Sequence, residues 1–211
     1  MFIPRHPVVE NQFCSYAEGT STGSAGVGGV VAYAGSVVYL DPTSTNEEAM
    51  VKAMAHGVTE TPFGFIMQKV KVGYHQVHPT GYYMPGDLGS SDVIAQPLYN
   101  NAGAITGHKS VPVGVAHLGI FDTVHYICES SGGTASVKMT PGQSLRAAAH
   151  EARLTNNATD ASDGATDADT GAYVTGVTTT VARVVKGASL AKCQANMDNV
   201  TLYPIRVKLL V

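Results

Sequence analysis

The sequence predicts a mainly β fold assembled from similar hairpins, with one or two short helices. Three observations predict this fold class. A short proline-and-glycine pattern occurs twice, and the last segment of the chain alternates apolar and polar residues. The composition adds 23 glycines and only 14% charged residues, against roughly 25% in an average soluble domain. With 211 residues the chain is long enough to bury a sizeable core.

The repeated pattern begins at Pro62 and again at Pro112, each followed after one apolar residue by Gly64 or Gly114. An apolar run follows in both copies. Proline lacks an N–H group and suits the entry of a strand or a sheet edge. A glycine inside a strand lets a neighbouring backbone approach closely. Both copies are therefore expected to be strands that end a hairpin unit.

The segments upstream of the two copies also correspond. Residues 37–45 (VVYLDPTST) and 93–107 (VIAQPLYNNAGAITG) each begin with a β-rich run that leads into a turn. In the second segment, Asn100, Asn101 and Gly103 are residues that favour tight turns. The predicted unit is a strand, a turn, a second strand and then the proline–glycine strand.

The strands expected elsewhere are rich in β-branched residues. In the final segment Ile205, Val207 and Leu209 alternate with polar neighbours, which is typical of a half-buried strand. This final segment covers residues 201–211, and the other expected strands cover residues 30–40, 123–128 and 173–186.

Two segments have helical features. In residues 45–57, Thr45 and Glu48 have capping-box spacing and Gly57 stands at a plausible helix end. This favours a short helix, although the repeat comparison predicts a strand near residues 50–55. Residues 141–154 contain good helix formers, although the family resemblance described below would make part of this segment a strand.

The first 29 residues predict an extended N-terminal arm. An apolar tip with Phe2, Ile3, Val8 and Val9 precedes a Gly/Ser/Thr-rich tether, and Arg5 lies within the tip. Apolar residues on a flexible tether suit binding to a neighbouring subunit. The alternative is a disordered terminus.

Residues 73–92 form a glycine- and tyrosine-rich connection. Tyr74, Tyr82 and Tyr83 combine a large apolar ring with a polar hydroxyl, a profile favoured at interfaces. The alternative is a loop packed on its own domain. These tyrosines join Phe2, Ile3, Arg5, Val8 and Val9 as the candidate partner-binding residues.

Charge and hydropathy exclude several function classes. The net charge of −3 gives no support for a nucleic-acid partner. No apolar run approaches the length of a membrane span. The widely spaced Cys14, Cys128 and Cys193 indicate reduced, buried thiols in a protein made in a cytoplasm.

Motifs for catalysis, cofactors or metals are missing from the sequence. The histidines lack metal-ligand spacing, and His150–Glu151 does not continue into a zinc-binding motif. The letters GTSTG at residues 19–23 resemble a nucleophile elbow but lie in the predicted arm. The Asp-rich residues 156–171 lack the order of a calcium loop and are expected to be a solvated loop, with weak Ca²⁺ binding by the carboxylates as the alternative. We therefore expect no enzyme activity, no cofactor and no metal.

The chain resembles the capsid decoration (cement) proteins of tailed bacteriophages. The similar segments are VVYLD at residues 37–41, PFGFIM at 62–67, VPVGVA at 111–116 and ARVVKGA at 182–188. The resemblance implies a small β-barrel or β-tulip domain that bridges neighbouring major capsid subunits on an assembled shell. It also implies a non-enzymatic virion protein, made in the host cytoplasm, whose partners are the major capsid protein and further copies of itself, as a trimer or alternatively a dimer.

With this resemblance the chain divides into four parts. These are an arm (1–29), a β-domain with both hairpin units (30–128), a loop-rich insertion or small subdomain (129–171) and C-terminal strands that return to the β-domain (172–211). Two other functions remain open at this point. One is a tail-tube or head–tail structural subunit, and the other is a carbohydrate-binding module that uses the tyrosines.

Overall fold

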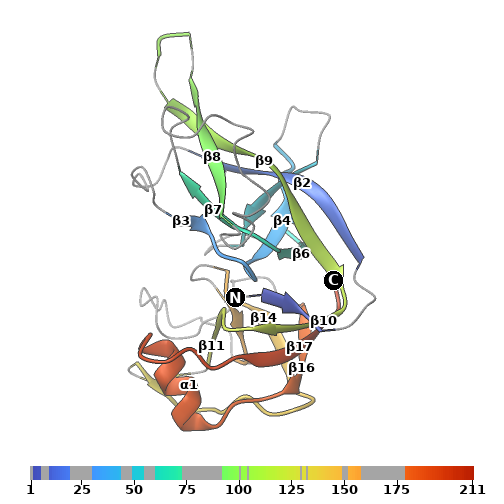
Figure 1. Cartoon of the computed structure of the whole chain (residues 1–211), viewed down its shortest axis with the longest axis vertical. Coiled ribbons are helices and arrows are strands. Elements are labelled where there is room, and N and C mark those ends of the chain that lie inside the picture. Colours follow the sequence, from blue (N-terminus) through green and yellow to red (C-terminus); the bar gives the residue numbers. More distant parts are fainter. Residues whose placement is uncertain are drawn as a thin grey trace, which may run out of the picture.

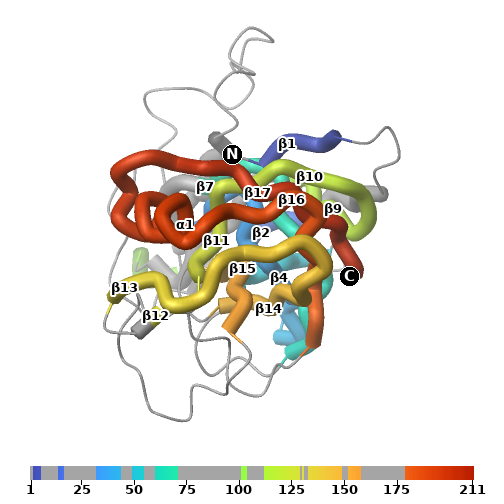
Figure 2. The backbone as a smooth tube through the Cα atoms, turned by 90° about the horizontal axis from the view of Figure 1, so that it is seen from below, coloured from blue at the N-terminus to red at the C-terminus, as the bar shows by residue number. Residues whose placement is uncertain are grey.

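The computed structural model describes residues 2–5, 10–19, 30–43, 49–54, 60–72, 92–99, 101–103, 105–128, 130–131, 133–148, 152–157 and 179–211. Across these residues the protein is mainly β, with two large sheets and one helix, α1 (Leu190–Met197). The two sheets, described below as the first and the second sheet, form the two halves of the molecule in Figure 1. In Figure 2 the second sheet covers one side of the first.

The first sheet contains a closed five-stranded barrel. β2 pairs with β5 on one side and with β9 on the other, which closes the ring in the order β2-β5-β4-β6-β9. Closure removes unpaired strand edges from the ring. The ring strands are β2 (Glu10–Gly19), β4 (Val37–Leu40), β5 (Met50–Ala53), β6 (Pro62–Ile66) and β9 (Ile105–Leu118). The sheet continues from β9 through β8 (Asp92–Tyr99), β7 (Lys69–Val72) and β3 (Val30–Ala32).

The barrel strands β4 and β6 bury apolar side chains on both faces. In β4, Val38 belongs to the cluster inside the barrel and its neighbour Val37 belongs to the cluster shared with the second sheet. In β6, Ile66 belongs to the same cluster as Val38, and Phe65 belongs to the same cluster as Val37. Successive side chains of a strand point to opposite faces. Runs such as VVYL and PFGFI therefore lack the apolar–polar alternation of a sheet with one wet face.

The second sheet has the strand order β1-β10-β17-β16-β14-β15-β11. All its pairings are antiparallel except that of β11 with β15. A two-stranded hairpin, β12 (Ser130–Ser131) with β13 (Thr134–Ala135), lies outside it. The strands of the second sheet are β1 (Phe2–Pro4), β10 (Ile120–Thr123), β11 (Tyr126–Ile127), β14 (Ser144–Ala147), β15 (Leu154–Thr155), β16 (Ala182–Lys186) and β17 (Ile205–Leu209).

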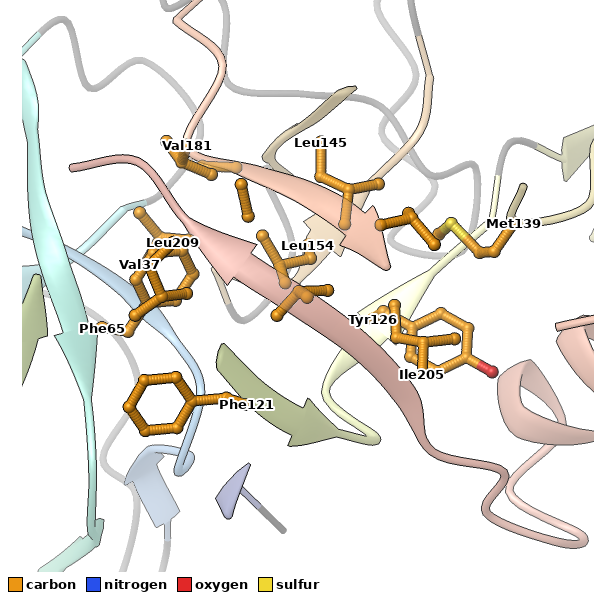
Figure 3. Packing of buried hydrophobic residues seen from close by; sticks show 14 of the residues in the cluster. Val37, Phe65, Phe121, Tyr126, Met139, Leu145, Leu154, Val181, Ile205 and Leu209 are labelled. Carbon is orange, nitrogen blue, oxygen red and sulfur yellow. The ribbon is translucent and has the colours of Figure 1, made fainter. Parts of the chain in front are cut away.

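One hydrophobic core joins the two sheets. Figure 3 shows Val37 and Phe65 of the barrel beside Leu209 and Phe121 of the second sheet, and all four are fully buried. Polar contacts cross the same boundary. The Val37 N–H donates to the carbonyl of Ala152 over 2.9 Å. Ser36 Oγ lies 3.0 Å from His125 Nε2, and both residues are buried.

The prediction that the proline begins a strand is confirmed for the first copy and wrong for the second. Pro62 is the first residue of β6, whereas Pro112 lies well inside β9. The two strands are antiparallel neighbours, with Phe65 opposite Ala116. The similar segments therefore pair with each other inside one barrel. The turn predicted near Gly103 is also present, between β8 and β9, and Gly103 has a φ of +77°.

Both helix predictions are wrong where the structure describes the residues. Met50–Ala53 forms β5, held between β2 and β4, as the repeat comparison suggested. Within residues 141–154, Ser144–Ala147 forms β14, which pairs with β15 and β16. In both cases pairing with distant strands overrides local helix propensity. The sequence had not assigned a helix to α1.

The extended N-terminal arm is not confirmed. Phe2–Pro4 pairs with β10 as the edge strand β1, and Glu10–Gly19 is a barrel strand. The remaining residues of the predicted arm, and the Asp-rich segment at 158–171, lie outside the described residues. The four-part division of the chain stays a prediction. The described strands change sheets between Pro4 and Glu10 and again between Leu118 and Ile120.

Candidate partner-binding surface

The predicted partner-binding residue Phe2 is part of the core. Its ring stacks on Phe121, with centroids 4.3 Å apart and planes 6° from parallel, and it lies 5.9 Å from the ring of Phe65. Only 8% of Phe2 is exposed, and Ile3 beside it is half-buried. Phe2 therefore joins a terminal strand to both sheets of its own chain.

Arg5 is the exposed part of the same segment. Its Nε donates to Asp122 Oδ2 over 2.7 Å, while Arg206 binds the same carboxylate through Nε at 2.7 Å and a terminal nitrogen at 3.2 Å. The hydrogen bond from Arg206, with a further one from Arg5, lowers the pKa of Asp122 against the opposing effect of burial. One carboxylate thus links three adjacent strands, β1, β10 and β17.

The other five predicted partner-binding residues, Val8, Val9, Tyr74, Tyr82 and Tyr83, lie outside the described residues. Of the predicted partner-binding residues that the structure describes, Phe2 and Ile3 lie on β1 and Arg5 directly follows it. Their role in binding stays a prediction.

A candidate surface that the sequence did not indicate lies at α1. Three large apolar side chains are exposed there: 45% of Leu190, 77% of Val200 and 54% of Leu202. We call these three residues the α1 surface. α1 lies at the end of the molecule opposite the β8–β9 hairpin (Figure 1).

The end of α1 explains why Val200 is exposed. Asn199 has a left-handed φ of 53°, which asparagine tolerates better than most residues. The Val200 N–H donates to the Ala195 carbonyl over 3.1 Å, and the Asn199 N–H donates to the Asn196 carbonyl over 3.3 Å. These are the two bonds of a Schellman motif, in which an apolar residue at the position of Val200 usually packs back onto the helix. Here its helical counterpart is the small Ala195, and Val200 stays exposed.

The segment after α1 is held in place. Tyr126 Oη donates to the carbonyl of Tyr203 over 2.9 Å, and Lys192 Nζ lies 5.3 Å from the centre of the Tyr203 ring. Leu202 therefore belongs to an anchored segment. A surface that is ordered before binding loses little conformational entropy when a partner covers it.

The buried polar groups act as structural ties. The Ser36 hydroxyl accepts the Tyr33 N–H over 3.2 Å in addition to contacting His125, and the Tyr33 ring stacks on the imidazole. Ser36 is 0% exposed, so a substrate cannot reach this hydroxyl in the folded state. In the described part of the chain, no three His, Cys, Asp or Glu side chains group as metal ligands.

Comparison of the chain with protein-family models, curated proteins and solved structures found no match. Among the described residues, no helix has the length and apolar character needed to cross a membrane.

Proposed function

We propose that this protein is a virion structural protein that decorates and cements an assembled capsid shell by bridging neighbouring major capsid subunits. The observation that carries the proposal is the α1 surface. Val200 and Leu202 place large apolar side chains in water on an anchored segment. Neighbouring exposed apolar side chains, here two residues apart in the chain, are candidates for a protein contact.

The low charge supports the same function. Charged residues make up 14% of the chain, well below the share in an average soluble domain. Interface cores are depleted of charge and enriched in aromatic residues and methionine. A subunit that spends its working life in contact with other proteins needs fewer charges for solubility than a free monomer.

The shape of the molecule suits bridging. The β8–β9 hairpin and α1 lie at opposite ends (Figure 1), and the shared core connects them. A subunit with separated contact surfaces can bind two neighbours at once, and many copies on a symmetric shell gain avidity from individually modest contacts. The tulip-like form of the barrel and assembly into trimers, or alternatively dimers, belong to this proposal.

Add-back to shells tests the proposal. Capsid shells that lack the protein are mixed with the purified chain, and bound copies are counted after sedimentation. The double variant Val200→Asp with Leu202→Asp should lower occupancy at limiting protein by roughly tenfold or more, because each buried apolar side chain stabilises a contact by about 1.5–3 kcal/mol. Leu40→Asp is the control, because Leu40 is 42% exposed on barrel strand β4, away from α1.

The location of the protein in source particles separates this function from the alternatives. A difference map should place the protein on the outer face of the shell. Density in the tail would instead support a tail subunit. Absence of the protein from intact particles would contradict the proposal. Unchanged occupancy of the α1-surface variant on shells would also contradict it.

A further inference from the structure

α1 is attached to the second sheet through a narrow buried face. Cys193 and Asn196 lie about one helical turn apart and are the buried residues of α1. Asn196 Nδ2 donates to the carbonyls of Val124 at 3.2 Å and Tyr126 at 3.1 Å. Asn196 Oδ1 is buried without a hydrogen-bond partner among the described residues. An unpaired buried acceptor weakens this attachment.

The N-terminal cap of α1 adds little stability. The helix has eight residues, its N-cap Ser189 makes no side-chain capping bond, and its first turn has no acidic residue. The last turn has no basic residue. Helices of this length are marginal by themselves and depend on tertiary packing. α1 is therefore suited to local opening.

Two thiols meet beneath α1. Cys128 lies two residues beyond Tyr126, a step of about 6.6 Å along an extended chain, and Cys193 lies three residues before Asn196, a step of about 4.5 Å along a helix. Because Asn196 contacts Tyr126, these short steps place both cysteines in the region where α1 meets β11. The thiols hydrogen-bond to each other, and both residues are buried in the same core cluster.

The environment of the two thiols differs. The hydrogen bond from Cys128 lowers the pKa of Cys193, with help from the backbone of Met139 and against the effect of burial. The same thiol–thiol bond, together with burial, raises the pKa of Cys128. The thiolate is the nucleophile in disulfide chemistry. Cys193 is the thiol that moves with α1, so it meets the oxidant and reacts first once α1 opens.

We propose that Cys128 and Cys193 form an intramolecular disulfide in the presence of a thiol oxidant, and that this bond locks α1 onto β11. With a diazene oxidant, the Cys193 thiolate adds to one nitrogen of the N=N bond. After α1 closes, the Cys128 sulfur displaces the resulting hydrazine. One S–S bond forms, two S–H bonds break, and the diazene takes up two electrons and two protons. The inference does not depend on the proposed capsid function.

Peptide mapping of the full-length protein tests this bond. The native chain is treated with the diazene diamide, denatured in excess N-ethylmaleimide and digested. The expected product contains a Cys128–Cys193 cross-link and alkylated Cys14. Cys14 is the internal control, since it is equally buried but belongs to the barrel cluster. Cys14→Ser should form the bond at the wild-type rate. A digest in which all three cysteines are alkylated, or in which Cys14 is cross-linked as readily, would overturn the proposal.

Thermal unfolding tests the locking effect. The oxidised chain should melt roughly 5–10 °C above the reduced chain, since the bond closes a long loop in the unfolded state. Cys128→Ser and Cys193→Ser should abolish the difference. If either variant fails to fold, the wild-type comparison decides by itself: equal melting temperatures for the mapped oxidised and reduced chains would show that the bond does not lock α1.

Discussion

Gly64 and Gly114 hold equivalent places in the repeated pattern, but their surroundings differ. A Cβ atom on Gly64 would lie 2.5 Å from Val115 Cγ1 and 2.9 Å from the Ala116 carbonyl oxygen. On Gly114 its nearest neighbour would be Met67 Sδ, at 3.1 Å. The first position faces the backbone of the adjacent strand, whereas the second faces the end of a flexible side chain. The close approach predicted from the sequence therefore holds for Gly64.

This difference gives a matched pair of variants. Gly64→Ala should lower the free energy of unfolding by about 2–3 kcal/mol, because β6 and β9 must move apart to admit the methyl group. Gly114→Ala should cost less than about 1 kcal/mol, because the Met67 side chain can shift. Urea unfolding measures both. Equal costs would show that the contact with β9 does not require glycine at position 64.

Asp122 is the second residue with a defined prediction. Its folded pKa lies below its usual value of about 3.9. The stability that this carboxylate contributes is therefore present above about pH 4 and is lost as the pH falls through the lowered folded value. Asp122→Asn should cost about 1–2 kcal/mol at pH 7, a modest effect because both arginines are partly exposed.

Urea unfolding at pH 7, 5 and 3 checks this dependence. The difference between wild type and Asp122→Asn should shrink toward pH 3. Arg206→Met should have a larger effect than Arg5→Met at pH 7, since Arg206 donates two hydrogen bonds to the carboxylate and Arg5 donates one. Stability curves that stay parallel over this pH range would contradict the assignment.

At the scale of elements, β1 shows how a terminal segment is recruited into the fold. The Arg5 N–H donates to the Ile120 carbonyl over 2.7 Å. Because the N–H groups of alternate residues in a strand point to the same side, the N–H groups of Ile3 and Arg5 point toward β10. Pro4 therefore lies where its missing N–H would face outward. A proline at an exposed edge discourages pairing with another strand. Phe2, which the sequence suggested as part of an arm, instead fills the boundary between the sheets with its ring.

The role of β1 predicts a large difference between adjacent residues. Phe2→Ala should lower the free energy of unfolding by about 3 kcal/mol, because it removes a buried ring stacked on Phe121. Ile3→Ala should cost about 1 kcal/mol, because Ile3 is half-buried. Urea unfolding of the two variants makes the comparison. A free arm would give no loss for either substitution.

Strands with local signals were predictable, and strands defined by their partners were not. The alternation of Ile205, Val207 and Leu209 predicted β17, and Pro62 predicted the start of β6. β5 carried helix-capping signals in its flanks, yet Met50–Ala53 pairs with two strands distant in sequence. Local propensity is worth only tenths of a kcal/mol per residue and gives way to such pairing.

At the scale of the whole molecule, the two sheets share one core. Val37 and Phe65 of the barrel and Phe121 and Leu209 of the second sheet belong to the same cluster. Because separating the sheets would expose these side chains together, the described body should unfold in a single transition. Differential scanning calorimetry should give equal calorimetric and van 't Hoff enthalpies.

A variant at the boundary extends this prediction. Ser36→Ala removes the hydroxyl beside His125 and should lower the free energy of unfolding by about 1 kcal/mol without splitting the transition. Two resolved transitions, in the wild type or in this variant, would mean that the barrel and the second sheet unfold separately.

The sequence by itself determined the β class, several strands and the close backbone approach at Gly64, because these depend on residue type and local periodicity. Tertiary structure decided that β2 closes the barrel by pairing with both β5 and β9, and that Phe2 belongs to the core. It also decided that Val200 and Leu202 are exposed and that Cys128 meets Cys193. The physical reason is that contacts between residues far apart in the chain depend on which surfaces are buried together, and local composition does not encode this.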